Sequence, residues 1–200
     1  EAEGRFIRNF VDYTSAELEN VFLEGTGSLI LDRQHQKAYC ALSPRADEDL
    51  VIEFCEDFEY TPIIFNAYQS HDGKRLPIYH TNVMMCVAEE FAVICLDTID
   101  DKKERKLVAE SLSQDGKEII TISEEQMNNF AGNMLQVQGA KDKFLVMSKT
   151  AHDALKPHQI EAIEKHCKIL SSDLSTIETH GGGSARCMLA EVFIPKVKES

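Results

Sequence analysis

The sequence predicts an α/β fold in which one β-β-α-β unit recurs about every 54 residues. Polar or small residues followed by an apolar, strand-like run occur four times, in residues 24–30, 80–86, 132–137 and 186–192. Equivalent positions in these segments are separated by 56 residues (Glu24 to His80), 53 (His80 to Asn133) and 54 (Asn133 to Cys187). Self-similarity at a fixed period is typical of repeat architectures.

The residues between these segments repeat as well. A second apolar run follows each of the first three segments after a short polar connection, which predicts hairpins at residues 37–42, 91–96 and 144–147. Helical spacing of apolar residues follows in residues 47–58, 102–112 and 157–167, the last beginning with Pro157, which suits a first helical turn. Third strands are predicted at residues 62–65, 118–122 and 168–170.

Units of this kind cannot bury their apolar faces alone, so they must pack as blades around an axis or as a stack. About three and a half units are present. A closed ring needs more, and the chain begins with Glu1 rather than Met, so we expect N-terminal sequence to be missing before it. An ordinary α/β chain with chance spacing is the alternative.

Composition argues against several classes of function. A chain of 200 residues with 43% hydrophobic content can form a sizeable core. The net charge of −13 argues against a nucleic-acid partner, since phosphate binding needs clustered Lys and Arg. No apolar run approaches the roughly 18 residues of a membrane span. No signal peptide is visible, and we expect a cytoplasmic protein.

Cysteine usage agrees with a reducing compartment. No two of the six cysteines form a C-x-x-C pair. Five of them lie in apolar stretches or predicted elements, where buried free thiols are expected: Cys40, Cys55, Cys86, Cys95 and Cys167. Cys187 follows three successive glycines, and this loop permits close approach to a ligand. Its neighbour Arg186 could favour the thiolate, although a packed cysteine before an edge strand is an equal alternative.

Glu24, His80 and Cys187 occupy equivalent positions of the repeat. In a ring of blades these positions converge near the axis, so three reactive side chains that are distant in sequence would meet. Taken singly, each has a plainer interpretation: the histidine as a structural residue and the glutamate as an exposed charge. The convergence that the repeat predicts is the argument for a site.

The segments resemble the guanidino-group-modifying enzymes, which include arginine deiminases, dimethylarginine hydrolases and amidinotransferases. The motifs that carry the resemblance are Phe-Leu-Glu-Gly-Thr-Gly-Ser (22–28), Ser-Pro-Arg (43–45), Tyr-His-Thr-Asn-Val-Met-Met (79–85), Phe-Ala-Gly-Asn-Met-Leu (130–135) and Gly-Gly-Gly-Ser-Ala-Arg-Cys-Met (181–188). They run in the family's order and cover nearly the whole chain. The resemblance is nearest to the citrulline-utilising, amidinotransferase-like hydrolases. It implies a single catalytic domain, residues 1–200, with the pentein fold of five ββαβ blades, here incomplete because an N-terminal part of about 100 residues is expected to be absent.

By that resemblance Cys187 is the nucleophile, His80 the general acid/base, and Glu24 the carboxylate that orients the substrate or the histidine. Arg45 matches an arginine that holds the substrate carboxylate, although a surface salt bridge is an alternative. Arginine deiminases carry Asp two residues after the histidine, where this chain has Asn82. A cationic guanidinium suits a carboxylate, whereas a neutral ureido group suits an amide that both donates and accepts. Asn82 therefore favours citrulline, unless it only caps a turn.

The expected activity is hydrolysis of a C–N bond in citrulline or a related ureido amino acid, releasing ornithine. An arginine deiminase or amidinotransferase is the nearest alternative, and a non-catalytic pentein protein that binds the ribosome is a remote one. The other histidines show no convincing ligand spacing, so neither a metal nor a cofactor is expected. A small amino acid is the expected partner, and a homo-oligomer is left open.

Overall fold

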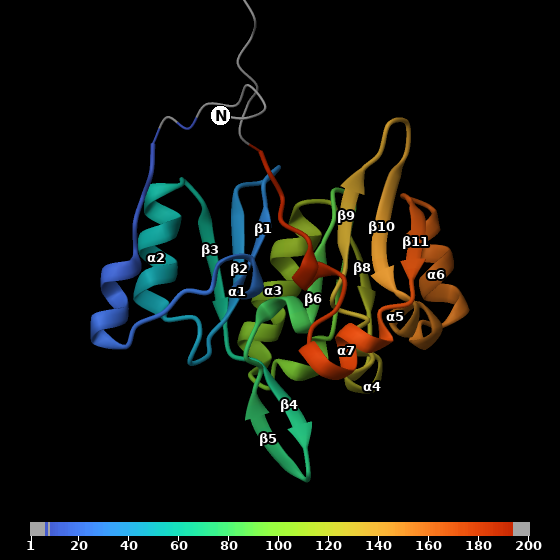
Figure 1. Ribbon diagram of the computed structural model, residues 1–200, viewed down its shortest axis with the longest axis horizontal. Helices are drawn as coiled ribbons and strands as arrows, with labels where there is room; N and C mark the ends of the chain where they lie inside the picture. The colour runs from blue at the N-terminus through green and yellow to red at the C-terminus, as the bar shows by residue number, and fades with distance from the viewer. Residues whose placement is uncertain (1–6, 8, 194–200) are drawn as a thin grey trace, which may run out of the picture.

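The computed structural model describes residue 7 and residues 9–193. Three small mixed sheets lie side by side, each with a helix against it (Figure 1). In each sheet the first strand pairs antiparallel with the second, and the second pairs parallel with the third. The predicted β-β-α-β unit is therefore present three times in the described chain.

The elements of the three units agree with the predicted ranges to within a few residues. The first unit consists of β1 (Leu29–Asp32), β2 (Lys37–Ala41), α2 (Glu48–Asp57) and β3 (Thr61–Phe65). The second consists of β6 (Met85–Val87), β7 (Phe91–Ile94), α3 (Lys102–Gln114) and β8 (Glu118–Thr121). The third consists of β9 (Leu135–Gln138), β10 (Lys143–Ser148), α6 (Pro157–Glu164) and β11 (Lys168–Ser172).

Aspartates begin two of the long helices. The side chain of Asp47 accepts from the backbone N–H of Asp49 before α2, and Asp101 accepts from two backbone N–H groups before α3. Such caps satisfy donors that the first helical turn leaves free. The helix starts predicted from apolar spacing alone agree with the positions of these caps.

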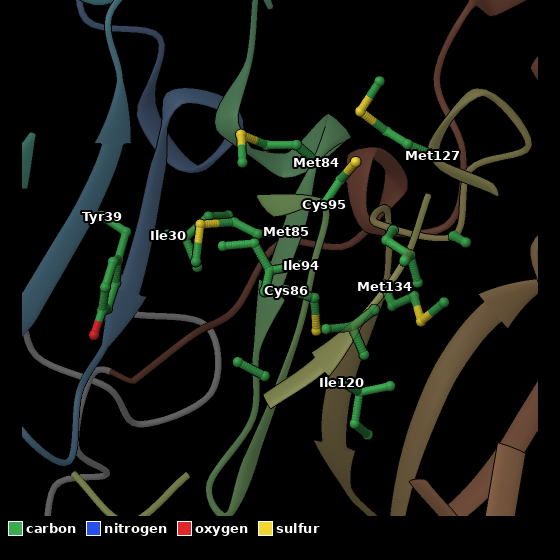
Figure 2. Packing of buried hydrophobic residues seen from close by; sticks show 14 of the residues in the cluster. Ile30, Tyr39, Met84, Met85, Cys86, Ile94, Cys95, Ile120, Met127 and Met134 are labelled. Carbon is green, nitrogen blue, oxygen red and sulfur yellow. The ribbon is translucent and has the colours of Figure 1, made fainter. Parts of the chain in front are cut away.

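The first strands of the units line a common interior. The middle one, β6, contacts both β1 and β9. Figure 2 shows Met85 of β6 lying between Ile30 of the first unit and Met134 of the third, all within one apolar cluster. A second cluster lies between α2 and the first sheet. Because the first strands adjoin one another, the residues preceding them lie at one end of the molecule.

Short helices and a hairpin outside the repeat join or flank the units. None of them was predicted from the sequence. They are η1 (Thr14–Glu19), α1 (Gly25–Ser28), β4 (Tyr68–His71), β5 (Lys74–Pro77), η2 (Thr81–Val83), η3 (Leu96–Thr98), α4 (Glu124–Asn128), α5 (Lys149–Ala154), α7 (Ser175–Gly181) and η4 (Arg186–Met188). None of the described helices combines the length and hydropathy of a membrane span.

The fourth predicted strand, within residues 186–192, is wrong. The structure has the 3₁₀ helix η4 there, and residues 189–193 belong to no strand. The buried guanidinium of Arg186 donates to the carbonyl of Leu189 at 2.7 Å, which folds the segment back on itself. Short helical turns likewise separate Glu24 and His80 from strands β1 and β6.

Candidate active site

Cys187 lies on η4, directly after the glycine loop that ends α7. Gly182 has φ +69°, a conformation that favours glycine. A Cβ on Gly183 would lie 3.1 Å from the Cβ of Cys187 and 3.2 Å from its sulfur, so the loop passes against the nucleophile candidate. Cys187 is exposed, while the other five cysteines are buried and free, as predicted.

Two amide side chains donate hydrogen bonds to this sulfur. Asn133 Nδ2 lies 3.2 Å from Sγ of Cys187, and Asn82 Nδ2 lies 3.5 Å from it. Asn133 is itself fixed, because its Oδ1 accepts from the backbone N–H of Arg186 at 3.0 Å and its Nδ2 also lies 3.2 Å from the carbonyl of Asn82. Both amides are 3% exposed. The sulfur therefore faces neutral donors.

Asn133 was not predicted as a site residue. The signal was present in its position, because it is the equivalent of His80 and Cys187 in the third unit. The repeat therefore predicts that Asn133 lies near those residues, but no role in the site was assigned to it. Its hydrogen bond to the sulfur is a finding of the structure.

His80 and Glu24 form the second group of the site. Nε2 of His80 lies 2.6 Å from Oε2 of Glu24, and Arg45 Nη1 lies 3.5 Å from the same carboxylate oxygen. A Cβ on Gly27 would lie 3.1 Å from two atoms of the His80 ring, so the α1 turn packs directly on the histidine. Of the two roles that the resemblance allowed for Glu24, the geometry favours orienting the histidine.

Tyr79 joins the two groups. Its ring centroid lies 5.1 Å from that of His80, and its hydroxyl donates to the carbonyl of Gly182 in the cysteine loop at 3.4 Å. Burial raises the pKa of the Tyr79 phenol, the nearby Cys187 raises it further, and Arg45 acts in the opposite direction. Tyr79 thus lies between the sulfur and the Glu24–Arg45 pair.

A cavity of about 130 Å³ opens at Cys187, with Asn133, Tyr79, Gly183, Phe130 and Gln69 among its lining residues. Phe130 has φ +63°, which is rare for a bulky residue and often marks a functional segment. Arg186 does not extend the site, because its guanidinium pairs with Glu191 at 3.0 Å. The structure therefore brings Glu24, His80, Asn82 and Cys187 to one end of the molecule, with Arg45 at its margin.

This arrangement of a thiol, a histidine and a carboxylate at one end of a ββαβ array can be compared with known proteins. The family described as N,N dimethylarginine dimethylhydrolase, eukaryotic, matches residues 1–194. The chain belongs to the dimethylarginine dimethylhydrolase family. It is thus a member of the guanidino-group-modifying superfamily that its motifs resemble. No curated protein matches the sequence.

Solved structures share the fold of this dimethylarginine dimethylhydrolase family member. ArgZ, an arginine dihydrolase from cyanobacteria, matches with a TM-score of 0.65 and 14% identity over 85% of this chain and 25% of that one. A mutant of AgrE in complex with L-arginine matches with a TM-score of 0.67 and 18% identity over 88% and 24%. The substrate-bound N-terminal domain of ArgZ matches with a TM-score of 0.64 and 16% identity over 84% and 56%.

At these identities the likeness shows a common fold. This family member spans between about a quarter and just over half of the length of those structures. The pentein architecture is therefore supported over part of those chains, while the number of five blades stays a prediction.

One further cluster of polar groups lies in the described part of this family member, at the far end of β1 from Glu24. Asp32, His35 and Asp115 offer atoms within 4.8 Å of one another, which is close enough for a metal. Two lysines already pair with the carboxylates: Lys117 with Asp32 at 2.8 Å and Lys37 with Asp115 at 2.7 Å. The cluster is a charge-balanced link between the first two units and not a vacant cation site.

Proposed function

We propose that this protein is a cysteine hydrolase that cleaves the C–N bond of citrulline or a closely related ureido amino acid. One observation carries the proposal. The two side chains hydrogen-bonded to Cys187 are both uncharged amides, and Oδ1 of Asn82 is buried without a hydrogen-bond partner among the described residues. A buried acceptor without a partner is costly, and an N–H group of a bound substrate would satisfy it.

A neutral head group of the substrate suits the Asn82 and Asn133 amides beside Cys187. A ureido group has a carbonyl acceptor and N–H donors, so it can both accept from and donate to an amide. A guanidinium carries a positive charge, which would be desolvated beside the sulfur with amides as its neighbours. Burying an unpaired charge is unfavourable. The amide environment therefore favours citrulline over arginine.

The chemistry begins with the thiolate of Cys187, which forms a bond to the ureido carbon. The bond from that carbon to the side-chain nitrogen of the substrate breaks, and ornithine leaves with a proton from His80. A carbamoyl group stays on the sulfur. Splitting the reaction through a covalent intermediate helps because the carbon, bonded to three heteroatoms, is a poor electrophile.

His80 then accepts a proton from a water molecule that attacks the carbamoyl carbon. The carbon–sulfur bond breaks, the thiolate is restored, and carbamic acid leaves and decomposes to ammonia and carbon dioxide. Glu24 supports both steps, because its hydrogen bond to Nε2 orients the ring and stabilises its protonated form. In this proposal Arg45, whose guanidinium is half exposed beside Tyr79, contributes positive charge for the substrate carboxylate.

A guanidino substrate is the second candidate, and family membership favours it. The matching family is described by hydrolysis of N,N-dimethylarginine. In that case the amides around Cys187 would face a cation, and a carboxylate from outside the described residues would have to pair with it.

The test is incubation of the complete protein with citrulline, arginine and N,N-dimethylarginine in separate reactions, with the products measured by mass spectrometry. Formation of ornithine from citrulline supports the proposal. Release of citrulline from either guanidino substrate, with citrulline itself left intact, would overturn it in favour of the second candidate.

A further inference from the structure

The units are joined by connectors that lie at the same end of the molecule as Cys187. The first connector is the β4–β5 hairpin, the second contains α4, and the third contains α7. Each contributes to the cavity at the sulfur, through Gln69, Asn128 and Gly183 respectively. In Figure 1 the hairpin extends beyond the other two connectors at this end. The turns before β1 and β6 and the η4 turn therefore carry the reactive groups, and the connectors contribute further residues to the cavity lining.

Gln69 presents a free amide on this wall. It lies on β4 opposite Leu76 of β5, and its side chain makes no hydrogen bond with another described residue. A cavity of about 130 Å³ is small beside the roughly 300–1,000 Å³ of pockets that enclose a whole ligand. Only part of an amino acid can therefore lie within it, and the remainder must extend past the lining residues, among them Gln69 of the hairpin.

A salt-bridge network fixes the hairpin. Arg75 of β5 pairs with Asp100 and with Glu124 of the second connector. Glu124 also accepts from the backbone N–H of Ser70 at 3.0 Å, one residue after Gln69. The hydrogen bond with Asp100, and after it the one with Glu124, raises the already high pKa of Arg75 further, so the guanidinium stays charged at neutral pH. Gln69 is thus carried by an anchored strand, which suits a residue that discriminates between ligands.

We propose that Gln69 determines substrate specificity by donating from its side-chain amide to the α-carboxylate of the amino-acid substrate. This inference rests on the proposed function, since it concerns the other end of the same substrate. With the ureido group at Cys187, the three-methylene chain of citrulline extends toward the mouth. An amide donor there complements a carboxylate, and Arg45, which lies over the Tyr79 ring, adds positive charge nearby. Gln69 should not contribute to the binding of an analogue that has the amine but no carboxylate.

The experiment compares the complete wild-type protein with the variants Gln69→Leu and Gln69→Glu. The KM for citrulline is measured together with the inhibition constant of N-carbamoylputrescine, which has the same head group but no carboxylate. We expect Gln69→Leu to raise the citrulline KM about tenfold, as for the loss of one hydrogen bond, and to change kcat and the inhibition constant less than about twofold. Gln69→Glu should raise the citrulline KM further and lower the inhibition constant, because its carboxylate repels one ligand and attracts the amine of the other.

Gln114→Leu is the matched control, since Gln114 ends α3 as an exposed residue away from the cavity. Arg75→Met, which releases the hairpin, should raise the citrulline KM, with partial recovery in Arg75→Lys. An unchanged KM in Gln69→Leu, or equal losses for both ligands, would overturn the inference while leaving the reaction intact. If the wild-type protein cleaves arginine and not citrulline, the proposed function fails, and arginine and agmatine then serve as the matched pair for Gln69.

Discussion

The side-chain amide of Asn133 donates to the sulfur of Cys187 at 3.2 Å, although 54 residues separate the two in sequence. This separation is the length of one structural unit, so the two residues hold equivalent positions in consecutive units. The same relationship links His80 to Glu24 across 56 residues. Residues that are one repeat apart in the sequence are therefore in contact in the structure. Two such pairs, Asn133 with Cys187 and Glu24 with His80, make up much of the candidate site.

We expect Asn133→Leu to reduce the reactivity of Cys187 without unfolding the protein. Leucine has a similar size but donates no hydrogen bond to the sulfur. A hydrogen bond to a charged group contributes about 1.5–3 kcal/mol, which corresponds to a roughly 10- to 100-fold lower kcat/KM. Slower alkylation of the native protein by iodoacetamide at pH 7 would show that the thiolate itself is affected.

The control for this change is Asn129→Leu, because Asn129 is exposed and its amide donates only to the carbonyl of Glu125 within its own helix. Equal alkylation rates in Asn133→Leu and wild type would mean that the contact has no influence on the sulfur.

Thiol chemistry should distinguish Cys187 from the buried cysteines. Burial raises the pKa of Cys40 and of Cys86 to about 12 and that of Cys95 to about 11. A thiol with so high a pKa is protonated at pH 8, and only the thiolate reacts with alkylating reagents. Brief treatment of the native protein should therefore label exposed Cys187 first, as peptide mass spectrometry can measure.

Substitution of Cys187 should abolish turnover. Loss of the nucleophile in Cys187→Ala removes the covalent step and should cost several kcal/mol in the barrier, or about a thousandfold or more in rate. Cys55→Ser, at a buried cysteine on the inner face of α2, should leave kcat nearly unchanged in protein that remains folded. Full activity of Cys187→Ala would rule out the covalent mechanism.

The sequence predicted the units because their apolar residues are buried in a regular pattern. Strands such as β7 are wholly buried, and the helices between them show apolar residues at helical spacing. The hairpin β4–β5 escaped prediction for the opposite reason. All of β5 and half of β4 are exposed, so no alternation of apolar and polar residues marks these strands.

Candidate site residues could be predicted from the sequence as far as the repeat extends. Equivalent positions and motifs pointed to Glu24, His80 and Cys187, and Asn82 was proposed from its place two residues after the histidine. Phe130 begins one of the quoted motifs but was assigned no role, and Gln69 lies in a hairpin that has no equivalent in the repeat. The approach of Gln69 to the cavity depends on tertiary contacts such as the Arg75 network, which leave no local pattern in the sequence.

The buried pair of Lys117 and Asp32 should be important for stability. Nζ of Lys117 is completely buried, lies 2.8 Å from Oδ2 of Asp32, and donates to the carbonyl of Ala88. Removal of one partner from a buried pair typically costs about 3–5 kcal/mol, because the other charge is left uncompensated. We expect Lys117→Met to lower the urea midpoint markedly, whereas Lys168→Met, at an exposed pair with Asp142, should change it little.

The stabilisation of the fold by the Lys117–Asp32 pair should decrease at acidic pH. Burial alone would raise the pKa of Asp32, but hydrogen bonds from Lys117 and His35 outweigh it and hold the pKa below its ordinary 3.8. The pair therefore stabilises the fold above pH 3.8 and loses this effect as the pH falls through the lowered value. The difference in unfolding free energy between wild type and Lys117→Met should shrink on acidification. A difference that is constant from pH 7 to pH 3 would contradict this explanation.

Substitution of Asn82 should change the choice of head group. The amide of Asn82 lies beside the sulfur of Cys187 and can donate to a ureido oxygen and accept from a ureido N–H, whereas aspartate can only accept. Asn82→Asp should therefore lower kcat/KM for citrulline, because its carboxylate would face a carbonyl oxygen in a buried position. It should also improve binding of arginine, whose charge would then be paired. One charged hydrogen bond of about 1.5–3 kcal/mol corresponds to a roughly 10- to 100-fold shift in the specificity ratio.

The measurement is kcat/KM for citrulline and for arginine in wild type and in Asn82→Asp. Asn128→Asp is the matched control, since it adds the same charge at an exposed position of the cavity rim. If both variants shift the citrulline-to-arginine ratio of kcat/KM equally, the effect comes from the added negative charge near the cavity and not from contact with the head group. A wild-type protein that already prefers arginine would show that the amides around the sulfur do not select a neutral substrate, and the pairing carboxylate should then be sought outside the described residues.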